Sequence, residues 1–208
     1  MWSPTADHPA FIPITDHTGL PRVLLIGDSI SMGYTIPTRK LLTGKANVHR
    51  PGTNCADTFT ALKYLDQWLG DAPWDVIHFN WGLHDLKYVD TVGNMVHVHK
   101  GKQQVLPAQY EQNLEVLVQK LLQTKAVLIW ATTTPVPPGA HGRIAGDEVK
   151  YNAVAAQVMR RHQIRVNDLH AFVVPRQQEI QQPRNVHFTT AGYELLAERV
   201  ADCIEAAL

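Results

Sequence analysis

A serine follows an apolar run near the start of the chain, in the stretch VLLIGDSI from Val23 to Ile30. The run Val23–Ile26 predicts a buried strand, so Ser29 falls just beyond the carboxyl end of that strand. An unaided serine hydroxyl is a poor nucleophile at neutral pH, and it needs a base, most often histidine, within about 2.6–3.2 Å. Ser29 is therefore a candidate nucleophile if the fold brings a histidine to it.

His187 is the histidine with the most suitable context among the eleven in the chain. It lies in the stretch NVHFTTAGYELLAERV, just before an amphipathic segment with a threonine cap that predicts a C-terminal helix. In an alternating α/β chain, a loop in this position reaches the sheet edge where the first strand ends. Taken singly, Ser29 also suits a turn or helix cap, and His187 also suits an ordinary loop, but together they predict a nucleophile and its base.

Short apolar runs alternate with segments of helical spacing along the chain. The expected strands are Val23–Ile26, Asn47–His49, Val76–Phe79, Val127–Ala131 and Ile164–Val166, and the expected helices are Thr58–Leu69, Pro107–Leu122, Asp147–Arg161 and Thr190–Ala207. This order predicts an α/β fold with a five-stranded parallel sheet, helices on both faces and reactive groups at the carboxyl ends of the strands. The long connections 88–104 and 132–146 are expected to shape a substrate cleft there.

Length and composition restrict the remaining possibilities. The 208 residues predict one domain, 1–208, in which residues 1–21, with four prolines, form an irregular arm. Nineteen basic residues balance nineteen acidic ones, so no nucleic-acid partner is expected. Cys55 and Cys203 are too few and too far apart for a disulfide framework. We expect a soluble protein with no signal peptide and no membrane partner, either cytoplasmic or secreted after removal of a signal, and its oligomeric state stays open.

Three sequence blocks, taken in order, resemble those of the SGNH, or GDSL-type, esterases and lipases. They are GDSI at 27–30, GLHD at 82–85 and VHFTTAGY at 186–193, and the resemblance runs from about Val23 to the C-terminus. It implies a three-layer α/β/α, flavodoxin-like fold and a serine esterase, in which Ser29 attacks an acyl carbonyl and His187 removes its proton. Asp28 is interpreted as a turn residue whose carboxylate binds local backbone amides.

The same resemblance implies three donors to the oxyanion, of which the backbone N–H of Ser29 is the first. The second block usually has a glycine, and the stretch NCADT places Ala56 there, with Gly52 as a competing candidate. The third block usually has asparagine where this chain has His84. A neutral imidazole is able to donate from one ring nitrogen, with Asp85 or a backbone carbonyl fixing its tautomer.

The position of the expected catalytic acid differs from the family pattern. That acid normally stands three residues before the histidine, where this chain has Arg184, followed by Asn185. One interpretation is a Ser-His dyad in which Asn185 or a backbone carbonyl holds the imidazole. The other is a triad whose acid is Asp168, after the fifth expected strand, although Asp168 also suits a helix cap.

No cofactor or metal is expected. The sequence after the first strand contains no glycine-rich phosphate-binding pattern, and His97 and His99 are not part of a Cys-x-x-Cys or His-Glu-x-x-His arrangement.

The predicted function is hydrolysis of short acyl esters, acetyl above all, on a small-molecule or carbohydrate substrate. No long apolar stripe marks an acyl tunnel, and four aromatic residues near expected strand ends suit either sugar stacking or the core: Trp74, Trp81, Tyr88 and Trp130. Two alternatives remain. One is a catalytically impaired carbohydrate-binding module on an esterase fold, and the other is a thioesterase or lysophospholipase.

Overall fold

The structure, a computed structural model, describes residues 8–208. Its centre is a five-stranded sheet, all parallel, in the order β2-β1-β3-β6-β7. The strands are β1 Arg22–Ile26, β2 Asn47–His49, β3 Val76–Phe79, β6 Val127–Ala131 and β7 Arg165–Asn167. The predicted parallel sheet is confirmed, and its last strand is displaced by one residue from the expected Ile164–Val166.

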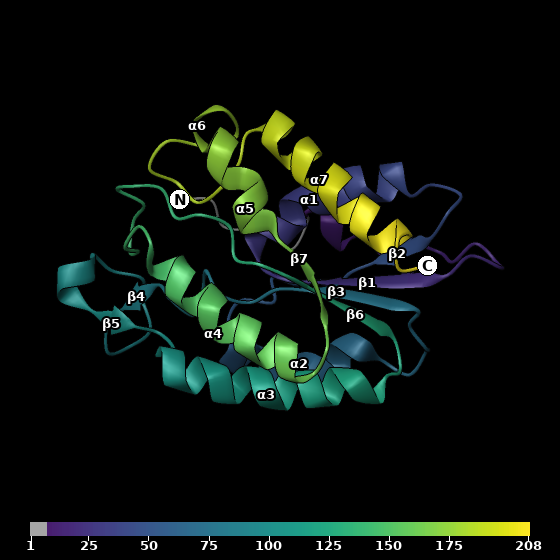
Figure 1. Ribbon diagram of the computed structural model, residues 1–208, viewed down its shortest axis with the longest axis horizontal. Coiled ribbons are helices and arrows are strands. Elements are labelled where there is room, and N and C mark those ends of the chain that lie inside the picture. Colours follow the sequence, from purple (N-terminus) through teal and green to yellow (C-terminus); the bar gives the residue numbers. More distant parts are fainter. Residues whose placement is uncertain (1–7) are drawn as a thin grey trace.

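Helices cover both faces of this sheet, as predicted (Figure 1). On one face lie α1 Ser29–Leu41, α5 Leu169–Val173, α6 Gln177–Ile180 and α7 Thr190–Glu205. On the other lie α2 Thr58–Leu69, α3 Pro107–Gln123 and α4 Asp147–Arg161. The inner strands are almost wholly apolar and buried, since helices exclude water from both sides of them.

The sequence reading did not include helix α1, although this helix presents Ser29. Gly33 and Pro37 lie within it, and both residue types disfavour a helix interior. The helix forms because Asp28 caps its first turn by accepting a hydrogen bond from the N–H of Ile30 at 2.9 Å. The predicted role of Asp28 as a residue that binds local amides is thereby confirmed.

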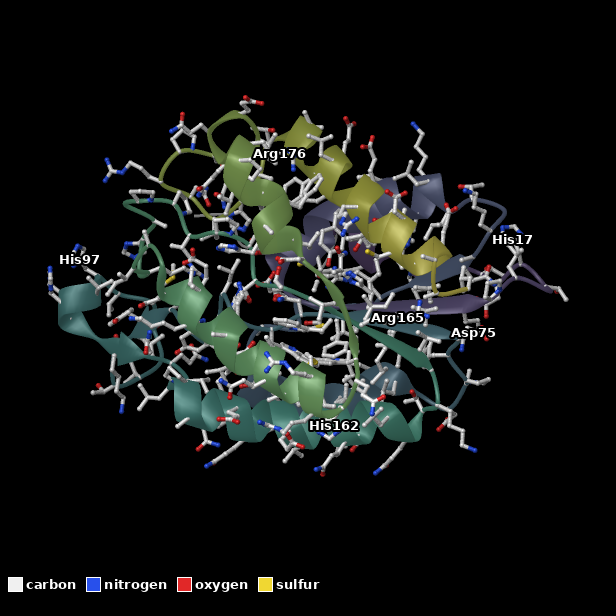
Figure 2. All side chains as sticks on the ribbon, in the orientation of Figure 1. His17, Asp75, His97, His162, Arg165 and Arg176 are labelled. Carbon is white, nitrogen blue, oxygen red and sulfur yellow. The ribbon has the colours of Figure 1, made fainter. Side chains whose placement is uncertain are left out.

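The connection 88–104 is more ordered than a plain loop. It contains a two-stranded antiparallel sheet, β4 Tyr88–Val89 with β5 Lys102–Gln103, and a 3₁₀ helix, η2 Val98–Lys100. Figure 2 shows His97 at the tip of this excursion, away from the body of the sheet. Its stem returns next to the carboxyl edge of the sheet, where Tyr88 donates its N–H to the carbonyl of Gly142.

Residues 8–21 run over the surface with one 3₁₀ helix, η1 Pro9–Phe11, and a second, η3 Val174–Arg176, follows α5. The Asn47 side chain holds the arm through bonds to the backbone of His17 and Leu20. The first seven residues of the predicted arm lie outside the described part of the chain. Among the described helices, none has the length and apolar content needed to cross a membrane.

Packing of α1 against α7 determines how the serine and the histidine approach each other, because α1 begins at Ser29 and α7 follows the loop of His187. Gly33 lies at the contact. A Cβ atom at position 33 would stand 2.1 Å from Cε1 of Tyr193 on α7, which is far below any van der Waals distance. Glycine is therefore required here for close approach of the two helices.

We predict that Gly33→Ala lowers the free energy of unfolding by about 1–3 kcal/mol, since the new methyl group overpacks the α1–α7 contact. Urea denaturation measures the change. Gly52→Ala is the matched control, because its Cβ would meet no atom within 4 Å, and it should stay within about 0.5 kcal/mol of the native protein. Equal stability of the two variants would contradict this view of the contact.

Candidate active site

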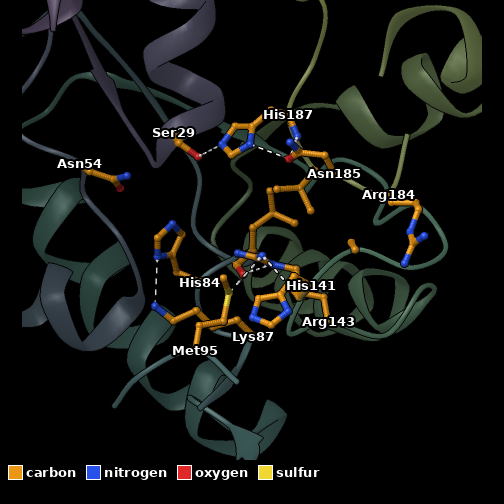
Figure 3. Close-up of a pocket in the computed structure, with 13 residues that line it drawn as sticks. Ser29, Asn54, His84, Lys87, Met95, His141, Arg143, Arg184, Asn185 and His187 are labelled. Carbon is orange, nitrogen blue, oxygen red and sulfur yellow. Dashed lines mark hydrogen bonds between the residues drawn. The ribbon is translucent and has the colours of Figure 1, made fainter. Parts of the chain in front are cut away.

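Ser29 and His187, separated by 158 residues, meet at the carboxyl edge of the sheet. Ser29 Oγ lies 2.9 Å from His187 Nε2, within hydrogen-bond distance (Figure 3). Ser29 is only 7% exposed, and it is the first residue of α1. The N-terminus of a helix carries partial positive charge and N–H groups without intrahelical acceptors, which favours negative charge developing beside the serine.

Asn185 contacts the other nitrogen of the His187 ring. Its Oδ1 atom is 2.7 Å from His187 Nδ1 and 3.1 Å from the backbone nitrogen of His187. A backbone N–H is only able to donate, so the amide atom that faces it is the oxygen. The same oxygen then requires a proton on Nδ1, which leaves the lone pair of Nε2 facing Ser29. The geometry thus fixes the tautomer that a general base needs.

The loop before α7 holds Asn185 in this orientation. Asn185 Nδ2 donates to Gln182 Oε1 at 3.0 Å, and Gln182 Nε2 donates to the carbonyl of Phe188 at 3.0 Å. Gln182 also donates its backbone N–H to the carbonyl of His187 at 2.9 Å. These bonds close a compact turn around the histidine. The imidazole ring and the Asn185 amide are therefore already held in place before a ligand binds.

Asp168 is placed as a helix cap and not in the pocket. Its Oδ1 accepts hydrogen bonds from the N–H of Ala171 and from Thr132 Oγ1, both at 3.0 Å. The carboxylate thereby closes the first turn of α5 and binds that turn to the end of β6. Of the two interpretations left open by the sequence, the geometry brings Asn185 to the imidazole.

A cavity of about 510 Å³ opens beside the serine. Ser29, Asn185 and His187 lie along the top of the view in Figure 3, and His84, Lys87 and Arg143 lie below them. Both long connections contribute, as expected, since Met95 comes from 88–104, and Ala140, His141 and Arg143 come from 132–146. The sequence analysis named the segments but missed Arg143 as an individual lining residue.

His84 lines this cavity, as its place in the third block suggested. Burial, followed by the charges of Lys87 and Arg143, holds the pKa of His84 well below its ordinary value, so the ring is neutral. Its Nδ1 lies 3.5 Å from Lys87 Nζ, and an ammonium group only donates. This contact favours a proton on Nε2, which is then free to donate to a ligand.

Asp85, one of the two groups that the sequence analysis suggested for fixing the His84 tautomer, contacts Thr58 instead. It points to the start of α2, where Oδ1 accepts from the N–H of Thr58 at 2.9 Å and from its hydroxyl at 2.6 Å. Burial raises the pKa of Asp85 to about 8, and Asn113 extends the network by donating to Thr58 Oγ1 at 2.9 Å. Asp85 therefore joins the third block to the second.

The second block differs in detail from the sequence expectation. The N–H of Ala56 donates to Asn54 Oδ1 at 2.9 Å, and the residue that lines the cavity is Asn54. Ala56 adopts φ +45°, the left-handed region that favours glycine. Because the Asn54 oxygen is engaged, its NH₂ group is the one that remains to donate to a ligand. Gly52 is exposed and does not line the cavity.

Of the two roles left open for the four aromatic residues, sugar stacking is not the one found in this cavity. Trp81 and Trp130 are fully buried in the core, and Trp74 lies before β3, at the opposite end of the sheet, with its ring under the Arg22 guanidinium. Tyr88 belongs to β4, and none of the four aromatic residues lines the cavity. Trp81 and Trp130 lie at or near the ends of strands because their large rings fill the core between the sheet and the helices.

The histidines form no metal site in residues 8–208: no group of three or more potential His, Cys, Asp or Glu ligands comes together there. His97 and His99 contact each other on η2 and its approach, with ring centres 5.0 Å apart.

Positive charge surrounds the serine and histidine. Burial, and then the Arg143 guanidinium, lower the pKa of His187 from its ordinary value of 6.5. Burial also lowers the pKa of Arg143 to about 10, a value at which it is still charged at neutral pH. The site therefore combines a neutral base with nearby cations, an arrangement that suits acyl transfer through an anionic intermediate.

Comparison with known proteins gives a family and a fold. The family model described as GDSL-like lipase/acylhydrolase matches residues 25–195. The structure is similar to that of the acetyl xylan esterase AlAXEase, with a TM-score of 0.70 and 16% identity over 88% of this chain and 99% of the other. The sequence matches none of the curated proteins.

Two further solved structures have the same fold. Axe2, an acetylxylan esterase from Geobacillus stearothermophilus, has a TM-score of 0.70 and 18% identity over 88% of this chain and 93% of its own. The lipase/acylhydrolase from Enterococcus faecalis has a TM-score of 0.68 and 22% identity over 90% of this chain and 96% of its own. The chain belongs to the GDSL-like lipase/acylhydrolase family and is a carboxylic ester hydrolase of the SGNH type.

Proposed function

We propose that the protein removes short acyl groups, acetyl above all, from the hydroxyl groups of a polar substrate such as a carbohydrate, with Ser29 as nucleophile and His187 as general base. One observation carries the assignment of roles: Ser29 Oγ stands 2.9 Å from a histidine nitrogen whose lone pair is fixed toward it by Asn185. The acetyl xylan esterases among the similar structures support the substrate class.

The reaction follows from these positions. Ser29 Oγ attacks the acyl carbonyl while its proton passes to Nε2 of His187. The tetrahedral oxyanion accepts hydrogen bonds from the N–H of Ser29, from His84 and, in the second block, from the NH₂ group of Asn54, since the N–H of Ala56 is donated to Asn54 Oδ1. His187 then gives its proton to the leaving alcohol, and it later activates the water that releases the acid from Ser29.

The number of polar and charged residues that line the cavity supports a small acyl group. Its apolar wall is limited to Leu83, Met95, Ala140 and Val186, and every other lining side chain is polar or charged. A long acyl chain that passed the charged lining residues would remove part of their hydration, which costs free energy. This argues for esterase over lysophospholipase or thioesterase activity on long chains.

We expect a fluorophosphonate to label Ser29 in a one-to-one ratio and Ser29→Ala to abolish hydrolysis of p-nitrophenyl acetate, because no other described hydroxyl contacts His187 Nε2. Intact-protein and peptide mass spectrometry locate the adduct. Ser31→Ala is the control: that hydroxyl donates to the carbonyl of Asp28 and accepts from Arg50, so labelling at Ser29 should persist. An active enzyme labelled elsewhere would overturn the assignment.

The pH dependence of kcat/KM should reflect the lowered pKa of His187. The base works only when neutral, so activity rises with pH through this pKa, and the acid limb should lie below pH 6.5. Replacing Arg143 with glutamine removes a positive charge that opposes protonation, so the pKa of His187 rises and the limb moves to higher pH. A limb above pH 7, or no movement in Arg143→Gln, would contradict the electrostatic account.

Substitutions at Asn185 test its role as a positioning residue. Asn185→Ala should lower kcat/KM by about ten- to hundredfold, because the Nδ1–H loses its acceptor and the ring its fixed tautomer. Asn185→Asp keeps the acceptor and adds a negative charge, so activity should survive while the acid limb moves to higher pH.

The control for this series is Asp168→Asn, which should change kcat/KM only a few-fold, since Asp168 caps α5 and has no contact with the imidazole. Circular dichroism verifies that each variant is folded. A large loss in folded Asp168→Asn, with little loss in Asn185→Ala, would show that Asp168 is the orienting acid.

A further inference from the structure

The cavity beside Ser29 is lined by cations and by no carboxylate. Lys87, Arg143 and Arg184 all contribute to its wall, together with His84, His141 and His187, and none of the lining residues is aspartate or glutamate. The whole chain has equal numbers of acidic and basic residues. The positive charge of the cavity is therefore a local concentration and does not follow from the overall composition.

These three cations have no ionic partner among residues 8–208. The ion pairs of the described chain involve other residues. Even exposed basic residues such as Lys45, Lys120 and Arg161 have a carboxylate partner. The acidic groups that act on Lys87 through space, Asp57 and Asp85, are engaged at the start of α2, where they accept hydrogen bonds from Thr60 and Thr58. They do not pair with Lys87.

Arg50, which is buried, has the contacts expected of an arginine with a structural role. Arg50 donates to the carbonyls of Gly27, Pro51 and Thr53 and to the hydroxyls of Ser31 and Thr35, so its guanidinium is surrounded by acceptors. Arg143, by contrast, has one bond of ordinary length, from Nε to the carbonyl of Leu83 at 2.9 Å. Its Nη1 lies 3.6 Å from the Met95 sulfur, which is a weak acceptor, and 3.5 Å from the carbonyl of His141, which is long for a hydrogen bond to oxygen.

Arg184 adds a third cation at the mouth. It is exposed, adopts φ +57° and packs over Gly139, where a Cβ would stand 3.0 Å from Arg184 Nε. This residue stands three positions before His187, where the related enzymes carry their acid, as the sequence analysis noted. At this position of the sequence the chain therefore carries a positive charge where the family pattern has a negative one, and Arg184 lines the cavity.

We propose that the natural ester carries a negative charge of its own, a carboxylate or sulfate close to the scissile acyl group, and that Lys87, Arg143 and Arg184 bind it. This inference rests on the proposed function and specifies its substrate: an acidic sugar or another hydroxy acid, acylated on a hydroxyl group. Lys87 and Arg143 are half-buried and Arg184 is exposed, so all three are accessible to a ligand in the cavity. An anionic ligand supplies acceptors for charged groups that have no carboxylate partner in the described chain.

A bound anion also assists the chemistry. The positive surroundings disfavour the imidazolium that forms on His187 during acyl transfer. A bound anionic substrate offsets the positive charge of the imidazolium. The attraction between the substrate anion and the site therefore becomes stronger as the proton reaches Nε2 of His187. The preference should then appear in kcat as well as in KM.

The test compares matched pairs of acetyl esters that differ only in charge. One pair is 3-acetoxybenzoate and 3-acetoxybenzamide, and the other is an acetylated methyl glucuronoside and its uronamide, with acetate release as the readout. 3-Acetoxybenzenesulfonate is added to distinguish sulfate-like from carboxylate recognition. We expect kcat/KM to favour the anion by roughly ten- to hundredfold in at least one pair, and the preference to shrink as salt is raised.

The ratio within each pair is also measured in variants. Lys87→Gln and Arg184→Gln should each reduce the anion preference at least several-fold, whatever happens to the rate on the neutral ester. Lys120→Gln is the matched control, because Lys120 pairs with Asp66 on the α2–α3 surface, and it should leave the ratio unchanged.

Ratios of one or below in both pairs, with the neutral esters hydrolysed at Ser29, would overturn the anionic substrate and leave the proposed esterase intact. Loss of all ester hydrolysis together with failure to label Ser29 would refute the proposed function instead. A preference that Lys87→Gln and Arg184→Gln both leave unchanged would also reject this binding site. Preference for the carboxylate alone, or for both anions, supports the proposal and defines the group recognised.

Discussion

The hydrogen bond between Asn185 Oδ1 and His187 Nδ1–H is the interaction on which the rest of the site depends. Without it, the imidazole would be free to place either nitrogen toward Ser29, and only one of the two tautomers is able to take the serine proton. The backbone N–H of His187 binds the same oxygen and thereby prevents the amide from turning over. A neutral side chain thus performs the orienting part of the work that an aspartate does in a triad.

The difference lies in charge. An aspartate also stabilises the imidazolium, whereas an amide oxygen offers only a dipole. Burial and then the Arg143 charge lower the pKa of His187, so both favour the neutral imidazole in the free protein. When His187 accepts a proton, its imidazolium has no carboxylate partner, and the cations of the cavity disfavour it further. The missing acid and the cationic lining therefore act in the same direction on the protonated base.

The sequence predicted most of the strands and helices of the fold, because parallel strands that are buried on both faces consist of short apolar runs. Strands β2, β3 and β6 and helices α2 and α4 agree with their predicted bounds, and β1, β7, α3 and α7 differ by one or two residues. Helix α1 was missed because Gly33 and Pro37 disfavour helix, and tertiary contact with Tyr193 is what makes the glycine suitable. Local propensity carries no information about such a contact.

In the site, order along the chain was sufficient to predict that Ser29, His187 and His84 share one cavity. It offered Asn185 as one of three candidate partners for the imidazole, beside a backbone carbonyl and Asp168. It did not indicate Asn54, Arg143 or Lys87, whose positions depend on how the loops fold back over the sheet. The sequence left the aromatic residues undecided for a related reason: a tryptophan near a strand end is equally suited to a substrate site or to the core, and Trp81 and Trp130 are both in the core. Burial of a ring depends on the layer above it, which the local sequence does not specify.

The most direct measurement of the central claim is the tautomer of His187 in the resting enzyme, read by long-range ¹H–¹⁵N NMR correlation of the imidazole at a pH above its titration. The account predicts a protonated Nδ1 and an unprotonated, acceptor-type Nε2, as the bond to Asn185 requires. A ring that carries its proton on Nε2, or that exchanges freely between the two forms, would contradict it.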